Sequence, residues 1–185
     1  MEEDNLVERL NCLKEGIRRD VSEQGLPNPN EVLRGHLWVT GYHEALQMYP
    51  KMSAILSMGP DLTEDIPHLT SFAHKRINIK DTNDTDLLQY LDECTDFIHL
   101  HKTGRVLVHC QAGASRSVAV VAAYLMRYHY LSLSQAMSCI RDARPLAWPN
   151  EGFMHQLQMY CSFQPMASKV SSNGSKQVCN GTPCQ

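Results

Sequence analysis

The sequence predicts an α/β fold, with a single domain in which a central, mostly parallel sheet is flanked by helices. Short apolar segments typical of buried strands alternate along the chain with segments of helical periodicity; they are Leu37–Val39, Met52–Met58 and Val106–Val108. Residues 106–108 show no polar alternation, which is typical of a central parallel strand covered on both faces. With 185 residues, 43% of them hydrophobic, the chain is long enough to bury one core.

Residues 1–29 are predicted to form an amphipathic helix and a turn-rich linker outside this domain. The apolar residues that recur at helical spacing are Leu6, Leu10, Leu13, Ile17 and Val21. The turn-forming residues 25–30, which include two prolines, end the helix. We expect the helix to pack on the domain, and a protein partner or a membrane surface is the alternative.

The first half of the domain alternates strands and helices. After the strand at Leu37–Val39, the residues His43–Met48 read as a short helix ended by Pro50, and Gly59–His68 reads as a loop. The alternation of Ile77 and Ile79 predicts a strand over 76–80. The polar residues 81–86 are expected to cap a helix that Gly104 ends, and its inner face is Leu87, Leu91, Cys94 and Ile98.

Three more helices complete the domain, which we place at residues 30–164. One begins near Ser115, a second is capped by Ser132 and stopped by Pro145, and a third is capped by Asn150 and ended by Pro165. Residues 165–185 are rich in Ser, Asn and Gly, so we expect a disordered tail.

Composition excludes several classes of function. A net charge of −3 and the lack of a basic stretch interleaved with aromatics argue against nucleic-acid binding. The longest apolar run, Val118–Met126, is far too short for a membrane span. The amino terminus is acidic, unlike a secretory signal, and the seven cysteines follow no disulfide or metal-ligand spacing. We therefore expect a protein of the cytoplasm, the nucleus or both, with no metal and no cofactor.

The chemistry is concentrated in residues 109–117, between the apolar strand and the helix that follows it. A loop that opens a helix offers unpaired amide N–H groups and the positive end of the helix dipole. Such a loop binds an anion, and a phosphate fits it best. The loop residues expected to surround the phosphate are Gln111, Ala112, Gly113, Ala114, Ser115 and Arg116.

Each polar residue of this stretch has a candidate role. Cys110 faces the amides and the helix terminus, which favour its thiolate and make it the candidate nucleophile. Arg116 is spaced to fold back over the phosphate and bind two oxygens. Gly113 permits the positive φ that the tight loop requires. Ser117 is placed to donate a hydrogen bond to the sulfur, and His109 is expected to point away from the phosphate in a supporting role.

These residues resemble the cysteine-dependent protein tyrosine phosphatases, and in particular the small, atypical dual-specificity phosphatases. The resemblance starts from residues 109–117 and extends to 37–41, 104–108, 123–126, 143–145 and 149–157, so it covers roughly residues 30–163. It implies a protein tyrosine phosphatase-like fold and hydrolysis through a phosphocysteine intermediate. It leaves the amino-terminal helix and the tail unexplained.

The resemblance also implies a general acid on a loop upstream of the nucleophile strand. Asp81, Asp84 and Asp86 are the candidates. The family pattern aligns best on Asp81, whereas Asp84 and Asp86 lie where a helix N-terminus favours carboxylates in any case. Asn150 is assigned a supporting role.

The expected substrates are phosphorylated proteins. Nothing upstream of Asp81 resembles the aromatic recognition loop of tyrosine-only relatives, so the resemblance implies a shallow site open to phosphotyrosine and to phosphoserine or phosphothreonine. Two alternatives remain open: a phosphatase of a non-protein phosphate, such as a phosphoinositide or an RNA 5′ phosphate, and a phosphoprotein-binding module with weak turnover. The loop positions 111, 112, 114 and 115 carry no lysine or arginine for a polyanionic substrate.

Overall fold

The computed structural model describes residues 30–60 and 72–163. The predicted amino-terminal helix, most of the predicted loop over 59–68 and the predicted tail lie outside the described residues. So does the expected end of the last helix at Pro165.

One five-stranded sheet forms the centre of the molecule, in the order β1-β2-β5-β3-β4. The strands are β1 (Glu31–Leu33), β2 (Leu37–Gly41), β3 (Ala54–Met58), β4 (Ala73–Ile77) and β5 (Val106–Cys110). Only the β1–β2 pairing is antiparallel, which confirms the predicted mostly parallel sheet. β5 lies in the middle, as its uninterrupted apolar sequence predicts. In the strand register, Cys110 lies beside Gly41 of β2 and Met58 of β3, at the carboxyl ends of all three strands.

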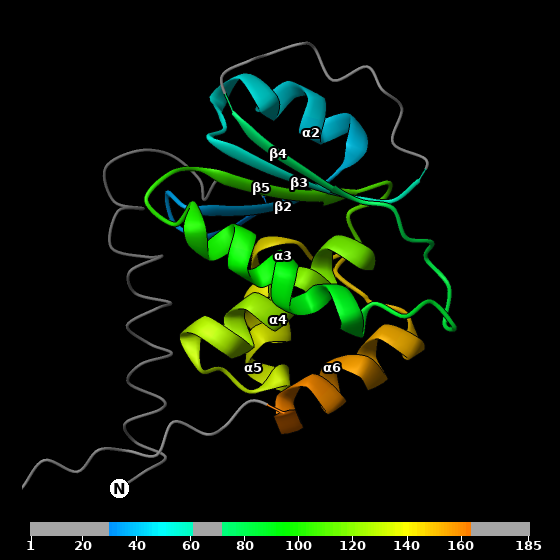
Figure 1. The fold of residues 1–185 in the computed structure, drawn as a ribbon. Coiled ribbons are helices and arrows are strands. Elements are labelled where there is room, and N and C mark those ends of the chain that lie inside the picture. Colours follow the sequence, from blue (N-terminus) through cyan, green and yellow to red (C-terminus); the bar gives the residue numbers. More distant parts are fainter. Residues whose placement is uncertain (1–29, 61–71, 164–185) are drawn as a thin grey trace, which may run out of the picture.

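Helices cover both faces of the sheet (Figure 1). The helices are α2 (Tyr42–Met48), α3 (Leu88–Leu100), α4 (Arg116–His129), α5 (Leu133–Ala143) and α6 (Glu151–Phe163), and a short 3-10 helix, η1 (Tyr49–Lys51), follows α2. α2 lies on one face, and α3 to α6 lie on the other. The two faces carry separate apolar clusters, because successive residues of a strand point to opposite sides.

This alternation decides where the residues of β5 point. Leu107 packs in the cluster of α2 and η1, while Val106, Val108 and Cys110 pack in the larger cluster on the side of α4. His109 hydrogen-bonds to Tyr49 of η1, so it lies on the α2 side. The last two residues of the strand therefore face opposite sides of the sheet.

The helix starts predicted from single residues are confirmed. The Ser132 hydroxyl accepts a hydrogen bond from the main-chain N–H of Gln135 at 3.3 Å, and Arg144 follows the last residue of α5. The Asn150 side chain accepts from the N–H of Phe153 at 2.8 Å and so caps α6. Both caps are local, and for this reason their sequence pattern predicts them.

Two predictions in the middle of the chain are wrong in detail. β4 spans Ala73–Ile77 and not 76–80, because its pairing with β3 ends where Met58 meets Ile77 and the chain then leaves the sheet. α3 begins after Leu87 with the predicted polar cap, because the Asp86 carboxylate accepts from the Gln89 N–H at 3.4 Å, but its end differs from the prediction. It ends at Leu100, and Gly104 lies in the turn that follows, where its N–H donates to the His101 carbonyl. The short antiparallel strand β1 has no counterpart among the predicted elements.

None of the helices in the described part of the chain has the length and apolar character needed to span a membrane.

Candidate active site

The loop that joins β5 to α4, residues 110–116, is called the phosphate loop below. It begins at Cys110, whose side chain is buried at the end of the central strand, and it runs directly into the first turn of α4. The loop lies at the carboxyl ends of β2, β5 and β3, an edge where open α/β sheets bind their ligands.

The phosphate loop holds its carbonyl oxygens outward, and donors from other elements bind four of them in succession. The four bonds are Tyr42 N to Gln111 O (3.1 Å), Arg144 Nη2 to Ala112 O (2.9 Å), Arg144 Nε to Gly113 O (2.7 Å) and Trp148 N to Ala114 O (2.7 Å). In a planar trans peptide the N–H points opposite to the C=O, so the amides of residues 112–115 turn to the inner side of the loop. An array of converging N–H groups of this kind binds an oxyanion.

The sulfur of Cys110 lies on that inner side. The Gly113 N–H donates to it at 3.2 Å, and the Ser117 hydroxyl lies 3.2 Å from it. Gly113 has a φ of +66°, and a Cβ added there would lie 2.3 Å from the main-chain carbon of Thr40. Glycine is therefore required at this position for its backbone conformation and for space.

Arg144 is a site residue to which the sequence assigned no role. It is buried, and its guanidinium also donates to Asn30 Oδ1 at 2.5 Å and to Glu44 Oε2 at 2.9 Å. Glu44 in turn accepts the main-chain N–H of Gly41 at 3.0 Å. The available signal was its place in the Ala143–Pro145 segment, but the targets of a long side chain cannot be read from sequence.

Arg116, the predicted phosphate ligand, is buried at the start of α4. Its Nη1 donates to the Ile79 carbonyl at 3.2 Å, and its Nε lies 3.5 Å from Asp81 Oδ2. A Cβ on Gly59 would lie 2.2 Å from Nη1, so the guanidinium occupies space that only glycine leaves open. Gly59 follows β3 and was read only as the start of a loop.

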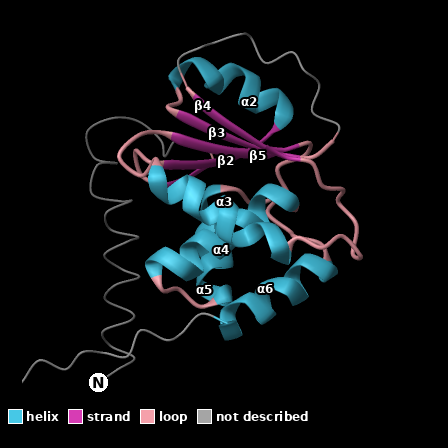
Figure 2. Cartoon of the chain, viewed as in Figure 1, coloured by secondary structure: helices cyan, strands magenta, loops and turns pink. Residues whose placement is uncertain are grey.

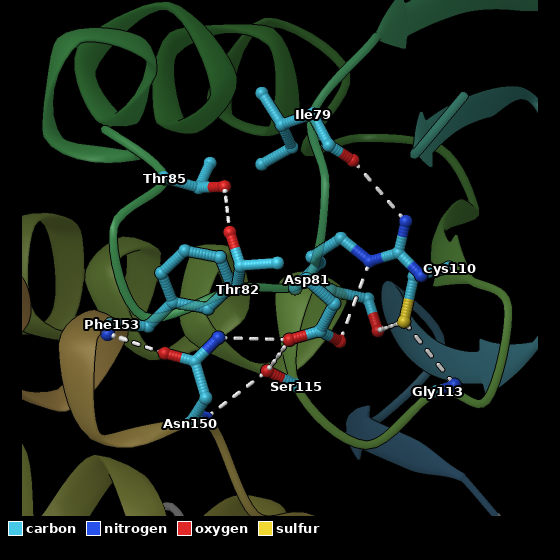
Figure 3. Close-up of polar contacts among 11 residues, drawn as sticks. Ile79, Asp81, Thr82, Thr85, Cys110, Gly113, Ser115, Asn150 and Phe153 are labelled. Atoms are coloured by element: carbon cyan, nitrogen blue, oxygen red, sulfur yellow. Dashed lines mark hydrogen bonds and ion pairs between the residues drawn. The ribbon is translucent and has the colours of Figure 1, made fainter. Parts of the chain in front are cut away.

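Asp81 is brought to the phosphate loop, as Figure 3 shows. Its Oδ1 accepts hydrogen bonds from Ser115 Oγ at 2.7 Å and from Asn150 Nδ2 at 2.9 Å. The other candidate acids have different surroundings. The side chain of Asp86 accepts from the Gln89 N–H in the first turn of α3. A hydrogen bond with Thr82 lowers the pKa of Asp84, which favours the ionised form that has no proton to donate.

Residues 78–87, called the acid loop below, run from β4 to α3 along the edge of the sheet and beside α6 (Figure 2). Gln156 of α6 holds the far end of this loop. Its Oε1 accepts from the N–H groups of Leu87 and Leu88 at 2.7 and 2.8 Å, and its Nε2 donates to the Thr85 carbonyl at 2.9 Å. The start of α3 is thus bound both by the local Asp86 and by α6, from a residue 69 positions after Leu87 in the chain.

Gly152 provides a second contact between α6 and the acid loop. Its N–H donates to Asn83 Oδ1 at 3.3 Å, and a Cβ on Gly152 would lie 2.0 Å from the Asn83 carbonyl oxygen. Together with Asn150 and Gln156, this close approach fixes the position of Asp81.

His109 lies on the opposite face of the sheet from Cys110. Its Nε2 is 2.8 Å from the Tyr49 hydroxyl and 2.7 Å from Ser57 Oγ, and Ser57 also hydrogen-bonds to His74 at 2.8 Å. Burial lowers the pKa of His109 to about 4, so the ring is neutral at neutral pH. The side chain anchors the strand directly before the nucleophile.

Across residues 30–60 and 72–163, no group of three or more His, Cys, Asp or Glu side chains is arranged to hold a metal ion.

Comparison with known proteins agrees with this geometry. The family model described as the dual specificity phosphatase catalytic domain matches residues 41–163, which is most of the chain. The chain belongs to the dual specificity phosphatase family. The match includes the whole phosphate loop, the acid loop and α6.

Relatives in the family include two named phosphatases. The chain is 48% identical over 93 residues to dual specificity protein phosphatase 1 of Arabidopsis thaliana, covering 49% of this chain and 47% of the relative. It is 41% identical over 110 residues to dual specificity protein phosphatase 19 of Mus musculus, covering 58% of this chain and 48% of the relative. The chain spans about half the length of these curated relatives.

Solved structures share the fold. The crystal structure of human DUSP28 superposes with a TM-score of 0.61 at 32% identity, covering 68% of this chain and 91% of that one. A human tyrosine phosphatase-like serine/threonine/tyrosine-interacting protein superposes with a TM-score of 0.63 at 28% identity, covering 71% of this chain and 94% of that one. Because the second of these is named for interaction, the case for turnover depends on the site residues.

Proposed function

We propose that this chain is a protein phosphatase that hydrolyses phosphotyrosine and phosphoserine or phosphothreonine through a phosphocysteine intermediate. The observation that carries the proposal is the phosphate loop, with four successive carbonyl oxygens bound on its outer side and its amides turned toward Cys110 Sγ. Membership in the dual specificity phosphatase family supports the same reaction.

In the first step, the Cys110 thiolate attacks phosphorus in line with the ester oxygen. The P–S bond forms as the P–O bond breaks, and the electron pair of that bond leaves with the oxygen. Asp81 donates a proton to this oxygen. The loop amides and the Arg116 guanidinium stabilise the three equatorial oxygens, which carry the charge in the transition state. The hydrogen bond that Ser115 of the phosphate loop donates to Asp81 keeps the acid beside this loop, which supports this division of roles.

In the second step, water attacks the phosphocysteine, the P–S bond breaks, and inorganic phosphate is released. The Asp81 carboxylate accepts a proton from that water, because it lost its own proton in the first step. Ser117, 3.2 Å from the sulfur, donates a hydrogen bond that stabilises the departing thiolate. Asn150 and His109 have positioning roles, since one binds Asp81 and the other anchors the strand before Cys110.

The experiment measures turnover of matched phosphotyrosine and phosphothreonine peptides, a soluble phosphoinositide and a 5′-phosphorylated RNA. We expect the wild type to hydrolyse both peptides, with a trapped phosphoenzyme on Cys110, and the Cys110→Ser variant to bind them without turnover. Cys94→Ser, the same substitution at a buried cysteine of α3 outside the phosphate loop, is the matched control and should keep turnover. Preferred hydrolysis of the inositide or the RNA would overturn the protein-substrate assignment, and turnover by Cys110→Ser would overturn the mechanism.

For location, we propose the cytoplasm, the nucleus or both. Cys94 and Cys110, both buried, form no disulfide, which suits a reducing compartment. Microscopy of the tagged full chain tests this, and accumulation in the secretory pathway would contradict it.

A further inference from the structure

The segment that connects α5 to α6 exposes two large apolar side chains beside the phosphate loop. Leu146 is 70% exposed and Trp148 is 71% exposed, whereas the alternate residues Ala147 and Pro149 are buried. An exposed tryptophan is uncommon enough to need a reason, because its ring contributes a large apolar area.

This segment is fixed in place and is continuous with the candidate active site. The Trp148 N–H binds the Ala114 carbonyl at 2.7 Å, and the Asn150 N–H donates to Ser115 Oγ at 3.1 Å. The backbone that carries the exposed side chains is thus bonded to two residues of the phosphate loop. A protein group bound to that loop lies next to this surface.

The Trp148 ring is also held from one side. The Arg141 guanidinium lies 4.7 Å from the ring centroid, in a cation–π contact, and its Nε donates to the Ala147 carbonyl at 3.2 Å. A ring that is already ordered loses little side-chain entropy when a ligand packs on it. Tryptophan and arginine are also the residues that most often dominate binding energy at interfaces.

The remaining large exposed apolar residues of the described chain are on other elements. They are Leu100 at the end of α3, Tyr130 after α4 and Met159 on α6. Single exposed apolar residues are ordinary, but two on one fixed segment at a catalytic loop are not.

We propose that Leu146 and Trp148 form a substrate-recognition surface, which binds an apolar or aromatic side chain near the phosphorylated residue of a protein substrate. The inference rests on the proposed function and adds to it a sequence preference. An extended peptide advances about 3.3 Å per residue, so the recognised side chain lies within about three residues of the phosphoamino acid. A polypeptide suits this surface better than an inositol phosphate, because an apolar ring gains little from a charged polyol.

The test uses pairs of phosphotyrosine peptides. The two members of a pair differ only in carrying Phe or Gly at one position, and the pairs together cover every position from three residues before to three residues after the phosphotyrosine. We expect one position at which the wild type prefers Phe by about tenfold in kcat/KM, the equivalent of about 1.4 kcal/mol. Trp148→Ala should remove that preference, and Trp148→Phe should retain part of it. The matched control is Leu100→Ala, an equally exposed apolar residue on α3, which should keep the wild-type preference.

Three outcomes would overturn the proposal. One is a wild type with no Phe preference at any position. A second is a Trp148→Ala variant whose kcat/KM falls equally for both peptides and for p-nitrophenyl phosphate, since this would give the side chain a structural role only. A third is a Trp148→Ala variant that loses activity only on phosphoinositide in vesicles, which would make a lipid surface the occupant.

Failure of the proposed function itself gives a different result. If the wild type hydrolyses no peptide, binding of the same peptides to Cys110→Ser, measured by fluorescence anisotropy, still reports the Phe preference. A Trp148-dependent preference in binding without turnover would retain the recognition surface and reject the phosphatase activity. No Trp148-dependent difference in binding would reject the surface.

Discussion

The phosphate loop and the acid loop meet at one site, but they are supported in different ways. The phosphate loop is fixed through its backbone: donors bind four of its carbonyl oxygens, and Gly113 lies against the backbone of Thr40. The acid loop has one close backbone contact, at Gly152, and is otherwise held by the side chains of Asn150, which caps α6, and Gln156 of α6. Backbone packing tolerates little displacement, whereas side-chain hydrogen bonds can be removed one at a time. We therefore expect mutations to abolish the function of the first loop and to reduce that of the second in steps.

The largest effect is expected from Gly113→Ala. The added Cβ would lie 2.3 Å from the Thr40 carbonyl carbon, so the loop must move and its amides lose their arrangement. We expect kcat/KM for p-nitrophenyl phosphate to fall to background.

Gly35→Ala is the matched control, because Gly35 has the same φ of +66° with nothing within 4 Å of the added Cβ. It should lower the free energy of unfolding by about 1–2 kcal/mol, the cost of a left-handed alanine, and leave activity intact. Full activity in Gly113→Ala would show that the loop is as adaptable as the acid loop.

The second-largest effect on kcat/KM is expected from Asp81→Asn. The amide retains the shape of the carboxylate but cannot donate the proton, so kcat/KM for phenyl phosphate should fall by about 10²–10⁴. The loss should be smaller for p-nitrophenyl phosphate, whose leaving group needs little protonation. Asp84→Asn and Asp86→Asn are the controls, and a larger loss in either one would transfer the role of acid to that residue.

A smaller effect is expected from Gln156→Leu, which leaves the N–H groups of Leu87 and Leu88 without their acceptor and loosens the acid loop. We expect kcat/KM for phenyl phosphate to fall by about tenfold, or about 1.4 kcal/mol. The loss should again be smaller for p-nitrophenyl phosphate. Gln156→Glu keeps the acceptor for Leu87 and Leu88 but loses the donor to the Thr85 carbonyl, so it should restore only part of the rate.

His155→Leu, an exposed position on the same helix, is the control for Gln156→Leu and should behave as the wild type. An equal loss on both substrates would contradict a role for Gln156 in positioning the acid. It would indicate a general loss of structure.

The sequence alone points to Cys110 and Arg116 but not to Arg144 or Gln156. Cys110 and Arg116 lie in one contiguous stretch, where strand, loop and helix follow directly, so the sequence alone places both residues on one loop. The roles of Arg144 and Gln156 depend on hydrogen bonds to residues 31 and 69 positions away. No local pattern encodes such a target, because it is set by how α5 and α6 pack.

The same distinction between local and distant contacts explains which bounds of helices and strands the sequence predicts. The starts of α5 and α6 are capped by Ser132 and Asn150 within one turn, and both were predicted. The start of α3 has the predicted local cap from Asp86 and, in addition, a hydrogen bond to Gln156 of α6 that no local pattern predicts. The position of β4 depends on its pairing with β3, and the alternation of Ile77 and Ile79 placed it three residues too late.

The smallest effect on turnover is expected at His109, behind the phosphate loop. Burial lowers its pKa from 6.5 to about 4. Between pH 6.5 and pH 4, the ring is therefore protonated in the unfolded chain and neutral in the folded chain. This contribution to stability is present above pH 6.5 and is lost as the pH falls toward 4, by about 2 kcal/mol at pH 5. His109→Gln should show a correspondingly weaker loss of unfolding free energy between pH 7 and pH 5 in urea titrations. An unchanged pH dependence would contradict the assignment.

The donors that shape the phosphate loop come from both sides of it in the chain. Tyr42 precedes it, and Arg144 and Trp148 follow it. During synthesis, a nascent chain that has emerged only through α4 already contains Cys110, Arg116 and Tyr42, but it lacks Arg144 and Trp148, which bind three of the four loop carbonyl oxygens. The complete set of contacts around Cys110 therefore forms late, after α5 and the segment beyond it have left the ribosome. The proposed anion site is thus complete only when the fold is nearly complete.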